Sequence, residues 1–264
     1  MTSLIEVPKL NLQETVDEIT GFIKEIVGKS RAKGVVVGLS GGVDSCVTAV
    51  LCVKALGKNN CLGVIMPTSF TPKEDVEDAE FLAQQLGIKV EKVNIDNISE
   101  SFFKALKVDL EKQKIPAANI IARIRMVILY YYANIENRLV VGTGDKSERL
   151  IGYFTKYGDG GVDFMPIAHL YKTQVRELAA YLGLPSRIVN KPSSPQLYPG
   201  HKVVDELPLD YDKLDKVLVG LFDLKLYPEK IEELTSIPLN KILIMFKRFN
   251  ETKHKREPPF FINK

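Results

Sequence analysis

Residues 38–45 could bind a phosphate group, and they read Gly38, Leu39, Ser40, Gly41, Gly42, Val43, Asp44 and Ser45. They follow an apolar run at 35–37 and precede a helix-forming stretch that begins at Cys46. The paired glycines allow backbone N–H groups to turn toward an anion without obstruction by a Cβ atom. The N-terminus of the following helix would add partial positive charge, and the two serines would add hydroxyl donors. The order of strand, glycine turn and helix therefore predicts an anion site.

Asp44 places a carboxylate inside this predicted anion site, which is favourable if a divalent cation lies between the carboxylate and the phosphate. The loop is not the P-loop of kinases and GTPases, because no Gly-Lys-Ser/Thr sequence ends it. It resembles the Ser-Gly-Gly-x-Asp-Ser loop of the ATP pyrophosphatases. The resemblance implies cleavage of ATP between its α- and β-phosphates and transfer of AMP to a substrate oxygen. The alternative is a tight strand-to-helix turn with incidental polar residues.

Alternating strands and helices must position this loop. Four strands are expected, at 35–39, 61–66, 90–95 and 139–142. Helices are expected at 11–31, 72–87, 97–112 and 118–137, and Thr71 and Glu74 should form a capping box at the start of the second one. This order predicts an α/β fold with a Rossmann-like, doubly wound parallel sheet and helices on both faces. Ligands bind such sheets at the carboxyl ends of the strands.

The pattern changes after residue 144. Residues 145–170 are rich in glycine and charge without clear periodicity, and four prolines predict an irregular loop at 190–208. Helices are expected at 171–182 and at about 210–222, 228–235 and 238–253. Because no repeat or flexible linker interrupts the chain, we expect a single domain over residues 1–264 with a helical C-terminal extension.

Composition narrows the classes of function. Lys and Arg number 36 against 33 Asp and Glu, so the net charge of +3 does not indicate a nucleic-acid partner. The three cysteines, Cys46, Cys52 and Cys61, lie in apolar segments and are expected to be buried and reduced, and without a Cys-x-x-Cys pair they do not indicate a zinc site. The N-terminus lacks the apolar core of a signal peptide, and the apolar stretch at 126–133 is too short to span a bilayer. We expect a cytoplasmic protein without membrane contact.

Two further segments have polar residues after the fourth predicted strand. In residues 142–148, Thr143 could contact the adenosine part of ATP and Glu148 could be a second metal ligand, although such a charged loop is often only solvated. Residues 152–163 combine aromatic side chains, four glycines, a lysine and two aspartates. This composition suits a loop shaped around a polar ligand, and the alternative is a glycine-rich surface loop.

Residues 152–163, Gly-Tyr-Phe-Thr-Lys-Tyr-Gly-Asp-Gly-Gly-Val-Asp, resemble the corresponding stretch of the ammonia-dependent NAD synthetases. The resemblance continues in Pro166-Ile-x-x-Leu-x-Lys172, in Ala122-Arg123-Ile-Arg125-Met126 and in His254-Lys255-Arg256, and it extends from about residue 15 to the C-terminus. It implies amidation of deamido-NAD with ammonia, with ATP as co-substrate and Mg²⁺ as cofactor. The AMP and pyrophosphate formed would come from an acyl-adenylate intermediate.

The resemblance also implies roles for individual residues. It assigns ATP binding to residues 38–45, Thr143, Lys172 and Ser194, and Mg²⁺ binding to Asp44 and Glu148; Asp44 and Lys172 would be catalytic. It assigns the deamido-NAD contacts to Arg123, Lys156, Asp163, His254 and Lys255. Ser194 stands where related bacterial enzymes have threonine, which keeps the hydroxyl group, and residues 144–147 differ from the bacterial sequences.

Several of these residues have simpler interpretations. Arg123 and Arg125 could extend to solvent or pair across a subunit contact, and His254 and Lys255 could be ordinary polar residues of a terminal segment. Lys172 has the unfavourable charge for a helix start, which we interpret as a sign of a nearby anionic ligand. The helix at 118–137 is apolar around much of its circumference, which predicts a homodimer.

The nitrogen donor is expected to be free ammonia, because the chain contains no recognisable glutaminase domain and its buried cysteines are poor nucleophiles. No base for the ammonia step can be identified from the sequence, and Asp163 is one candidate among several. Two other functions remain open at this point, a tRNA-modifying ATP pyrophosphatase and a non-catalytic ATP-binding module.

Overall fold

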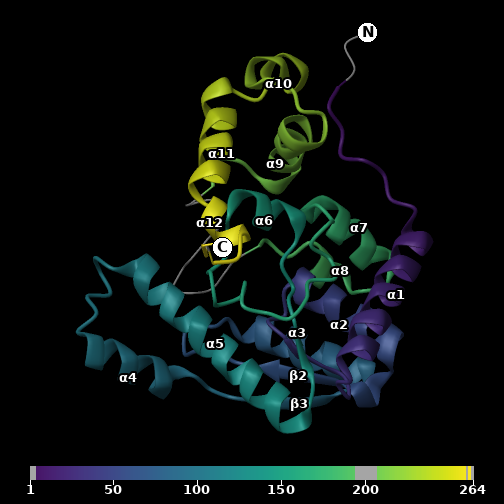
Figure 1. The fold of residues 1–264 in the computed structure, drawn as a ribbon, viewed down its shortest axis with the longest axis vertical. Helices are drawn as coiled ribbons and strands as arrows, with labels where there is room; N and C mark the ends of the chain where they lie inside the picture. Colours follow the sequence, from purple (N-terminus) through teal and green to yellow (C-terminus); the bar gives the residue numbers. More distant parts are fainter. Residues whose placement is uncertain (1–3, 194–206, 260, 263–264) are drawn as a thin grey trace.

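The computed structural model describes residues 4–193, 207–259 and 261–262. Ser194, one of the residues expected to bind ATP, lies outside the described residues. The described strands form one parallel sheet of β1 (Val35–Gly38), β2 (Cys61–Ile65), β3 (Lys89–Lys92) and β4 (Leu139–Val141). The predicted parallel α/β architecture is confirmed (Figure 1).

The strand order, β3-β2-β1-β4, determines where a ligand can bind. The chain runs from β1 outward to β2 and β3 and then returns to pair β4 on the other side of β1, with Val35 opposite Leu139 and Val37 opposite Val141. The connections that leave β1 and β4 therefore diverge at the carboxyl ends of two neighbouring strands. In open α/β sheets this divergence creates the crevice that holds the ligand.

Both faces of the sheet are covered by helices, because successive side chains of a strand point to opposite faces. Val35 and Val37 pack with α1 (Leu12–Ser30), α2 (Val43–Leu56), α3 (Lys73–Leu86) and α7 (Lys172–Tyr181). Val36 packs on the other face with α5 (Lys114–Glu136) and α4 (Asp96–Leu106). Burial on both faces explains the unbroken valine run in β1.

The C-terminal helices form a separate hydrophobic cluster, above the sheet layer in Figure 1. The elements of this cluster are α9 (Tyr211–Leu218), the π-helical turn η3 (Val219–Asp223), α10 (Pro228–Thr235) and α11 (Leu239–Glu251). The short helix α12 (Lys253–Arg256) follows α11 and adds no buried residue. Ile5, Ile151 and Tyr171 belong to the same cluster, so this layer packs on the N-terminal segment and on the elements after β4.

Several element boundaries differ from the predictions. The helix α3 begins at Lys73 with Pro72 as N-cap, and the Thr71 hydroxyl instead accepts the N–H of Thr68 at 2.9 Å. β3 ends at Lys92, three residues before the predicted end, and α5 begins four residues before the predicted start. Among the described residues, four short elements were not predicted, η1 (Lys58–Asn60), α6 (Lys146–Ile151), α8 (Ser186–Val189) and α12 (Lys253–Arg256).

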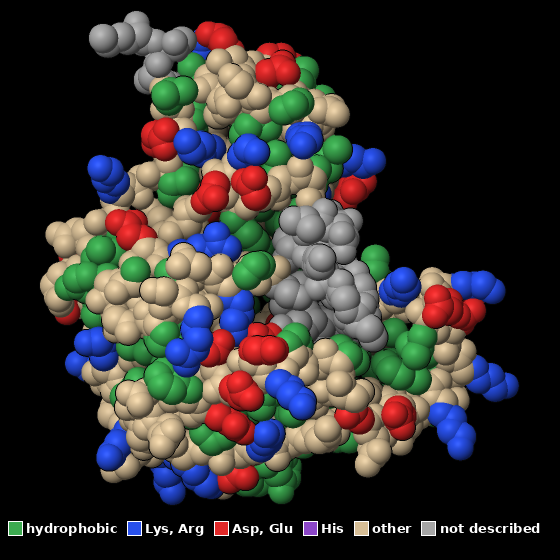
Figure 2. All heavy atoms as spheres, turned by 180° about the vertical axis from the view of Figure 1, so that it is seen from behind, with side chains coloured by type: hydrophobic (Ala, Val, Ile, Leu, Met, Phe, Trp, Pro, Cys, Tyr) green, Lys and Arg blue, Asp and Glu red, His purple; other side chains and the backbone are tan. Residues whose placement is uncertain are grey.

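The surface agrees with the modest net charge. On the face shown in Figure 2, Lys and Arg side chains are interspersed with Asp and Glu, and no continuous basic surface is visible over the described residues. Within the same described ranges, no helix is both long enough and apolar enough to cross a membrane.

Candidate active site

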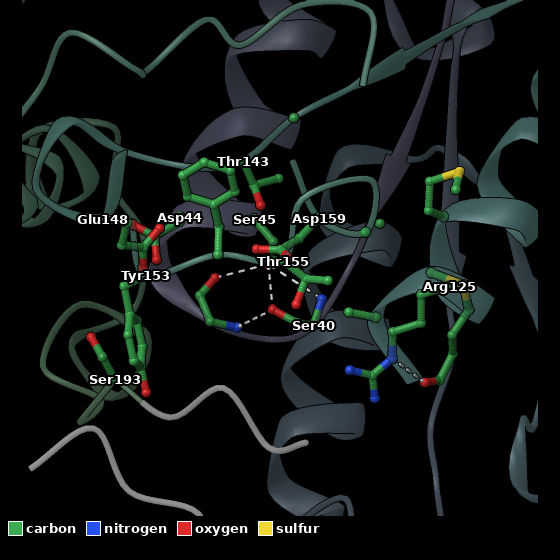
Figure 3. Close-up of a pocket in the computed structure, with 18 of the residues that line it drawn as sticks. Ser40, Asp44, Ser45, Arg125, Thr143, Glu148, Tyr153, Thr155, Asp159 and Ser193 are labelled. Atoms are coloured by element: carbon green, nitrogen blue, oxygen red, sulfur yellow. Dashed lines mark hydrogen bonds between the residues drawn. The ribbon is translucent and has the colours of Figure 1, made fainter. Parts of the chain in front are cut away.

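The connection from β1 to α2 forms a tight loop, as the sequence predicted. Gly41 has a φ angle of +76°, and a Cβ atom there would lie 2.1 Å from the carbonyl oxygen of Asp75, so only glycine fits. The Ser45 hydroxyl donates to the carbonyl oxygen of Gly42 at 2.9 Å and shares a 3.1 Å hydrogen bond with the Ser40 hydroxyl (Figure 3). These bonds hold the loop at the start of α2, where the helix dipole favours an anion.

A cavity of about 650 Å³ lies at the carboxyl ends of β1 and β4. All loop residues from Gly38 to Ser45 except Gly41 line it, together with Thr143 and Glu148 from the connection after β4. The glycine-rich residues 152–159 supply part of the wall, and α5 supplies another part. The volume is in the range of pockets that enclose small molecules and cofactors.

Three carboxylates converge at one end of this cavity. Asp44, Asp145 and Glu148 each offer an oxygen atom, and the three atoms lie within 4.8 Å of one another. Asp145 was not predicted as a site residue. It is the N-cap of α6 and forms a capping box, in which its Oδ1 accepts the N–H of Glu148 at 2.8 Å. The pattern Asp145-x-x-Glu148 is a recognisable helix-start signal, and it could have located α6 from the sequence.

Lys172, the first residue of α7, is fully buried among these carboxylates. Its Nζ lies 2.6 Å from Asp44 Oδ2, 2.8 Å from Asp145 Oδ2 and 2.9 Å from Glu148 Oε1. Burial alone would lower the pKa of Lys172, but the three negative charges outweigh it and raise the pKa above its ordinary value. The charge of Lys172 at a helix start predicted an anionic ligand nearby, and in the structure three carboxylates of the protein lie beside it.

The donor set fits a divalent metal ion. When all groups are ionised, three carboxylates and one ammonium group leave an excess of negative charge, and desolvation raises the pKa of Asp145 to about 6. Asp44 Oδ1 is buried and has no hydrogen-bond donor among the described residues. Carboxylate oxygens are the ligands that Mg²⁺ prefers.

Four of the residues expected to contact deamido-NAD lie together beside the glycine-rich loop. Lys156 Nζ donates to the carbonyl oxygen of His254 at 2.6 Å, and Arg123 donates to the carbonyl oxygen of Lys156 at 3.2 Å. Lys255 lines the cavity, and its Nζ donates to the carbonyl oxygen of Phe154 at 2.7 Å. The fold therefore joins segments that are about a hundred residues apart in the sequence.

The fifth residue, Asp163, lies elsewhere. Its Oδ2 accepts the N–H of Val140 at 2.7 Å, its Oδ1 accepts the hydroxyl of Tyr130 at 3.1 Å, and it does not line the cavity. One carboxylate oxygen of Asp163 thus contacts β4 and the other contacts α5, which weakens the suggestion that Asp163 is a base. Asp159 does line the cavity, and desolvation raises its pKa although the N–H of Thr155 donates to Oδ1 at 2.8 Å.

Arg125 and Lys191 are basic residues of the cavity wall that had no role assigned from the sequence. Arg125 lies on the side of the cavity away from Asp44 and Glu148 (Figure 3), and burial lowers its pKa to about 10. Residues 123 and 125 point to different faces of α5 because they are two positions apart on a helix. Lys191 donates to the carbonyl oxygen of Gly41 at 3.1 Å. No local sequence signal identifies Lys191, because its partners lie more than a hundred positions earlier.

The three cysteines are free and buried, as the sequence predicted. Burial is the main cause that raises the pKa of Cys46 and of Cys61 to about 12. Thiols in this state are weak nucleophiles.

A parallel sheet with a glycine loop after β1 and a carboxylate cluster at its switch point defines a nucleotide-binding α/β protein of the ATP pyrophosphatase fold. Residues 15–259 match the model of the NAD synthase family. The chain therefore belongs to the NAD synthase family and is an enzyme of this type.

Individual relatives agree over nearly the whole chain. The NH(3)-dependent NAD(+) synthetase of Staphylothermus marinus is 48% identical over 257 residues, which are 97% of this chain and 92% of the relative. Among solved structures, NH3-dependent NAD synthetase from Campylobacter jejuni, in complex with the nitrate ion, has 32% identity and a TM-score of 0.82. NMN synthetase from Francisella tularensis has 31% identity and a TM-score of 0.85. Each structural match covers 97% of this chain and 100% of the other.

Proposed function

We propose that this enzyme forms NAD from deamido-NAD and free ammonia, with ATP as the co-substrate and with AMP and pyrophosphate as the other products. The observation that carries the proposal is that one cavity joins the phosphate loop, the carboxylate cluster and the glycine-rich loop with Lys255. The curated relatives are named as NH(3)-dependent NAD(+) synthetases, which supports the same reaction.

In the first step the phosphates of ATP would lie on residues 38–45, with Thr143 toward the adenosine and Ser194 as a further hydroxyl donor. The nicotinate carboxylate attacks the α-phosphorus, a new O–P bond forms, and the bond to the pyrophosphate oxygen breaks. This displacement needs positioning and charge stabilisation rather than a protein nucleophile. The loop N–H groups and the ammonium group of Lys172 would supply both.

Asp44 and Glu148 would hold Mg²⁺, since both carboxylates line the cavity and their donor atoms are oxygens. A bound Mg²⁺ would offset the negative charge of the phosphates and favour departure of pyrophosphate. Arg123, Lys156, His254 and Lys255 would contact deamido-NAD at the cavity rim. Asp163 would not contact deamido-NAD directly and would support the site only through its hydrogen bonds to Val140 of β4 and to Tyr130.

In the second step ammonia attacks the acyl carbon of the adenylate, a C–N bond forms, and AMP leaves. Ammonium must first lose a proton. Asp159 would accept it, because it lines the cavity, its pKa is raised, and it is not one of the proposed metal ligands. A base is most useful when its pKa lies near the working pH.

We further propose a homodimer, a cytoplasmic location and a single domain that uses ammonia rather than glutamine. On α5, Val127, Tyr131 and Ile135 form one stripe at four-residue spacing, and they are 60%, 59% and 60% exposed. Such a stripe of large apolar side chains suits contact with a second copy. The cytoplasmic location is proposed because ATP is a cytoplasmic metabolite. The use of ammonia is proposed because Cys46, Cys52 and Cys61 are buried and therefore unsuited to hydrolyse glutamine.

The test is product analysis with ATP, Mg²⁺, ammonium and deamido-NAD, and in parallel with nicotinic acid mononucleotide. We expect AMP, pyrophosphate and NAD, whereas ADP and orthophosphate would rule out the mechanism. Preference for the mononucleotide, the substrate class suggested by the name of the Francisella tularensis neighbour, would correct the substrate. Ammonia-free glutamine should give little NAD. ATP binding without turnover, or a mobility shift with tRNA, would favour the two alternative functions.

The Asp44→Asn variant should lose nearly all turnover, because it removes a carboxylate charge that faces the phosphate loop. Asp212→Asn is the matched control: Asp212 is exposed on α9, and the same change there should leave the rate unchanged. Near-normal activity of Asp44→Asn at saturating Mg²⁺ would remove Asp44 from the active site.

A further inference from the structure

Asp215 is a fully buried acidic residue on α9, outside the cavity. Its Oδ1 accepts the hydroxyl of Ser147 at 2.5 Å. Its Oδ2 accepts two bonds from Thr173, one from the backbone N–H at 2.9 Å and one from the hydroxyl at 2.8 Å. Burying a carboxylate costs free energy unless hydrogen bonds satisfy it, so these three donors explain how Asp215 is tolerated.

The donors belong to the two helices that carry the proposed catalytic groups. Ser147 lies on α6 between Asp145 and Glu148, and Thr173 follows Lys172 at the start of α7. The two helix starts are also joined directly, because the Ser147 hydroxyl oxygen accepts the backbone N–H of Lys172 at 3.0 Å. The Asp215 carboxylate of the C-terminal layer therefore binds the first turn of α6 and the first turn of α7 together.

The same face of α9 reaches the carboxylate cluster a second time. Tyr211, one helical turn before Asp215, places its ring 5.1 Å from the Nζ of Lys172. The C-terminal helical layer therefore contacts the charged end of the cavity through two side chains of one helix. Neither side chain supplies an atom to the cavity wall.

We propose that Asp215 is a positioning residue, which sets the distance between Lys172 and the carboxylates of Asp145 and Glu148. Through Asp215 the C-terminal helices would hold in place the starts of α6 and α7, which carry Glu148 and Lys172. The inference rests on the proposed ATP site. Displacement of catalytic groups by about 1 Å can lower a rate about 100-fold, so a role of this kind is measurable.

Asp215→Asn keeps the shape of the side chain but replaces one acceptor oxygen by an NH₂ group, which cannot accept from Ser147 or Thr173. We expect kcat to fall about 10- to 100-fold, with KM for deamido-NAD nearly unchanged. Asp212→Asn, the same change at an exposed position of the same helix, should behave as wild type. Circular dichroism and a thermal melt establish that each variant is folded at the assay temperature.

A double-mutant cycle with Ser147→Ala separates positioning from general stability. If Asp215 acts through Ser147, the double variant should be slowed less than the product of the two single effects. Wild-type kcat in a folded Asp215→Asn enzyme, or strictly multiplicative effects in the cycle, would overturn the proposal. If Asp215→Asn does not fold, Ser147→Ala alone decides, and a wild-type rate there overturns it.

ATP binding to the wild-type enzyme, measured by calorimetry with Mg²⁺ and without deamido-NAD, distinguishes the two levels of inference. No binding would contradict the proposed ATP site. Binding by wild type together with an unaltered Asp215→Asn enzyme would leave that site intact and reject only the role of Asp215.

Discussion

Replacing Lys172 by methionine tests the charge balance of the active site. The ammonium group is fully buried within 2.9 Å of oxygens from Asp44, Asp145 and Glu148, and the Asp145 side chain is fully buried as well. Methionine has a similar volume but no charge, so Lys172→Met leaves three carboxylates facing one another. Removing one partner of a buried ion pair costs about 3–5 kcal/mol.

For a chain of this size, 1 kcal/mol corresponds to a change of about 2–4 °C in Tm, so we expect Lys172→Met to lower Tm by roughly 6–20 °C. The assay is thermal unfolding followed by circular dichroism at neutral pH in the presence of EDTA. Lys230→Met is the matched control, because Lys230 forms an exposed pair with Glu233 at 2.7 Å. That control should change the free energy of unfolding by at most about 0.5 kcal/mol.

Adding Mg²⁺ to the same experiment tests the link between Lys172 and the metal. A divalent cation would replace part of the missing positive charge, so Mg²⁺ should raise Tm more for Lys172→Met than for wild type. If Lys172→Met melts at the wild-type temperature in EDTA, the three carboxylates do not depend on Lys172, and our account of the cluster is wrong.

Three further predictions concern the loop, the proposed dimer and the thiols. Gly41→Ala should lower the ATP-dependent rate about 100-fold, since its Cβ atom would lie 2.1 Å from the carbonyl oxygen of Asp75. Gly28→Ala is the control, because open space surrounds Gly28, and it should keep the wild-type rate. Initial rates of the two variants test this prediction. Val127→Glu should halve the mass measured by sedimentation at micromolar concentration, and an unchanged dimer would move the interface elsewhere. Burial raises the pKa of Cys61 to about 12, so its contribution to stability is full below the ordinary thiol pKa of 9.0 and is lost as the pH rises toward 12. Alkylation at pH 8.5 should therefore require unfolding, and rapid native modification would contradict this burial.

The parts of the fold that depend on local sequence were predictable. The valine run, the paired glycines and the helix after them determine β1, its loop and α2 within one short segment. The parallel sheet followed from the alternation of strands and helices. The α6 helix was missed because its six residues are too few for periodicity, although its capping box was present at Asp145 and Glu148.

The interactions that complete the site were not predictable, because they join distant segments. Lys172 and Asp44 are 128 positions apart, and Lys191 and Asp75 are 116 positions apart. Asp215 reads in the sequence as an ordinary polar residue of an amphipathic helix, and only packing reveals that it is buried against Ser147 and Thr173. A single sequence contains the residue types of such contacts but not their partners.

The exposure of the three carboxylates indicates that Asp145 has a different role from Asp44 and Glu148. The Asp145 side chain is fully buried, and its Oδ1 is already used by the N–H of Glu148, so its remaining oxygen faces Lys172. The Asp44 and Glu148 side chains are 20% and 22% exposed and line the cavity. A cation that enters with ATP can therefore reach Asp44 and Glu148 without disturbing the contact between Asp145 and Lys172. Asp145 keeps the buried ammonium group in place, whereas Asp44 and Glu148, which also contact Lys172, face the cavity where the proposed metal would bind.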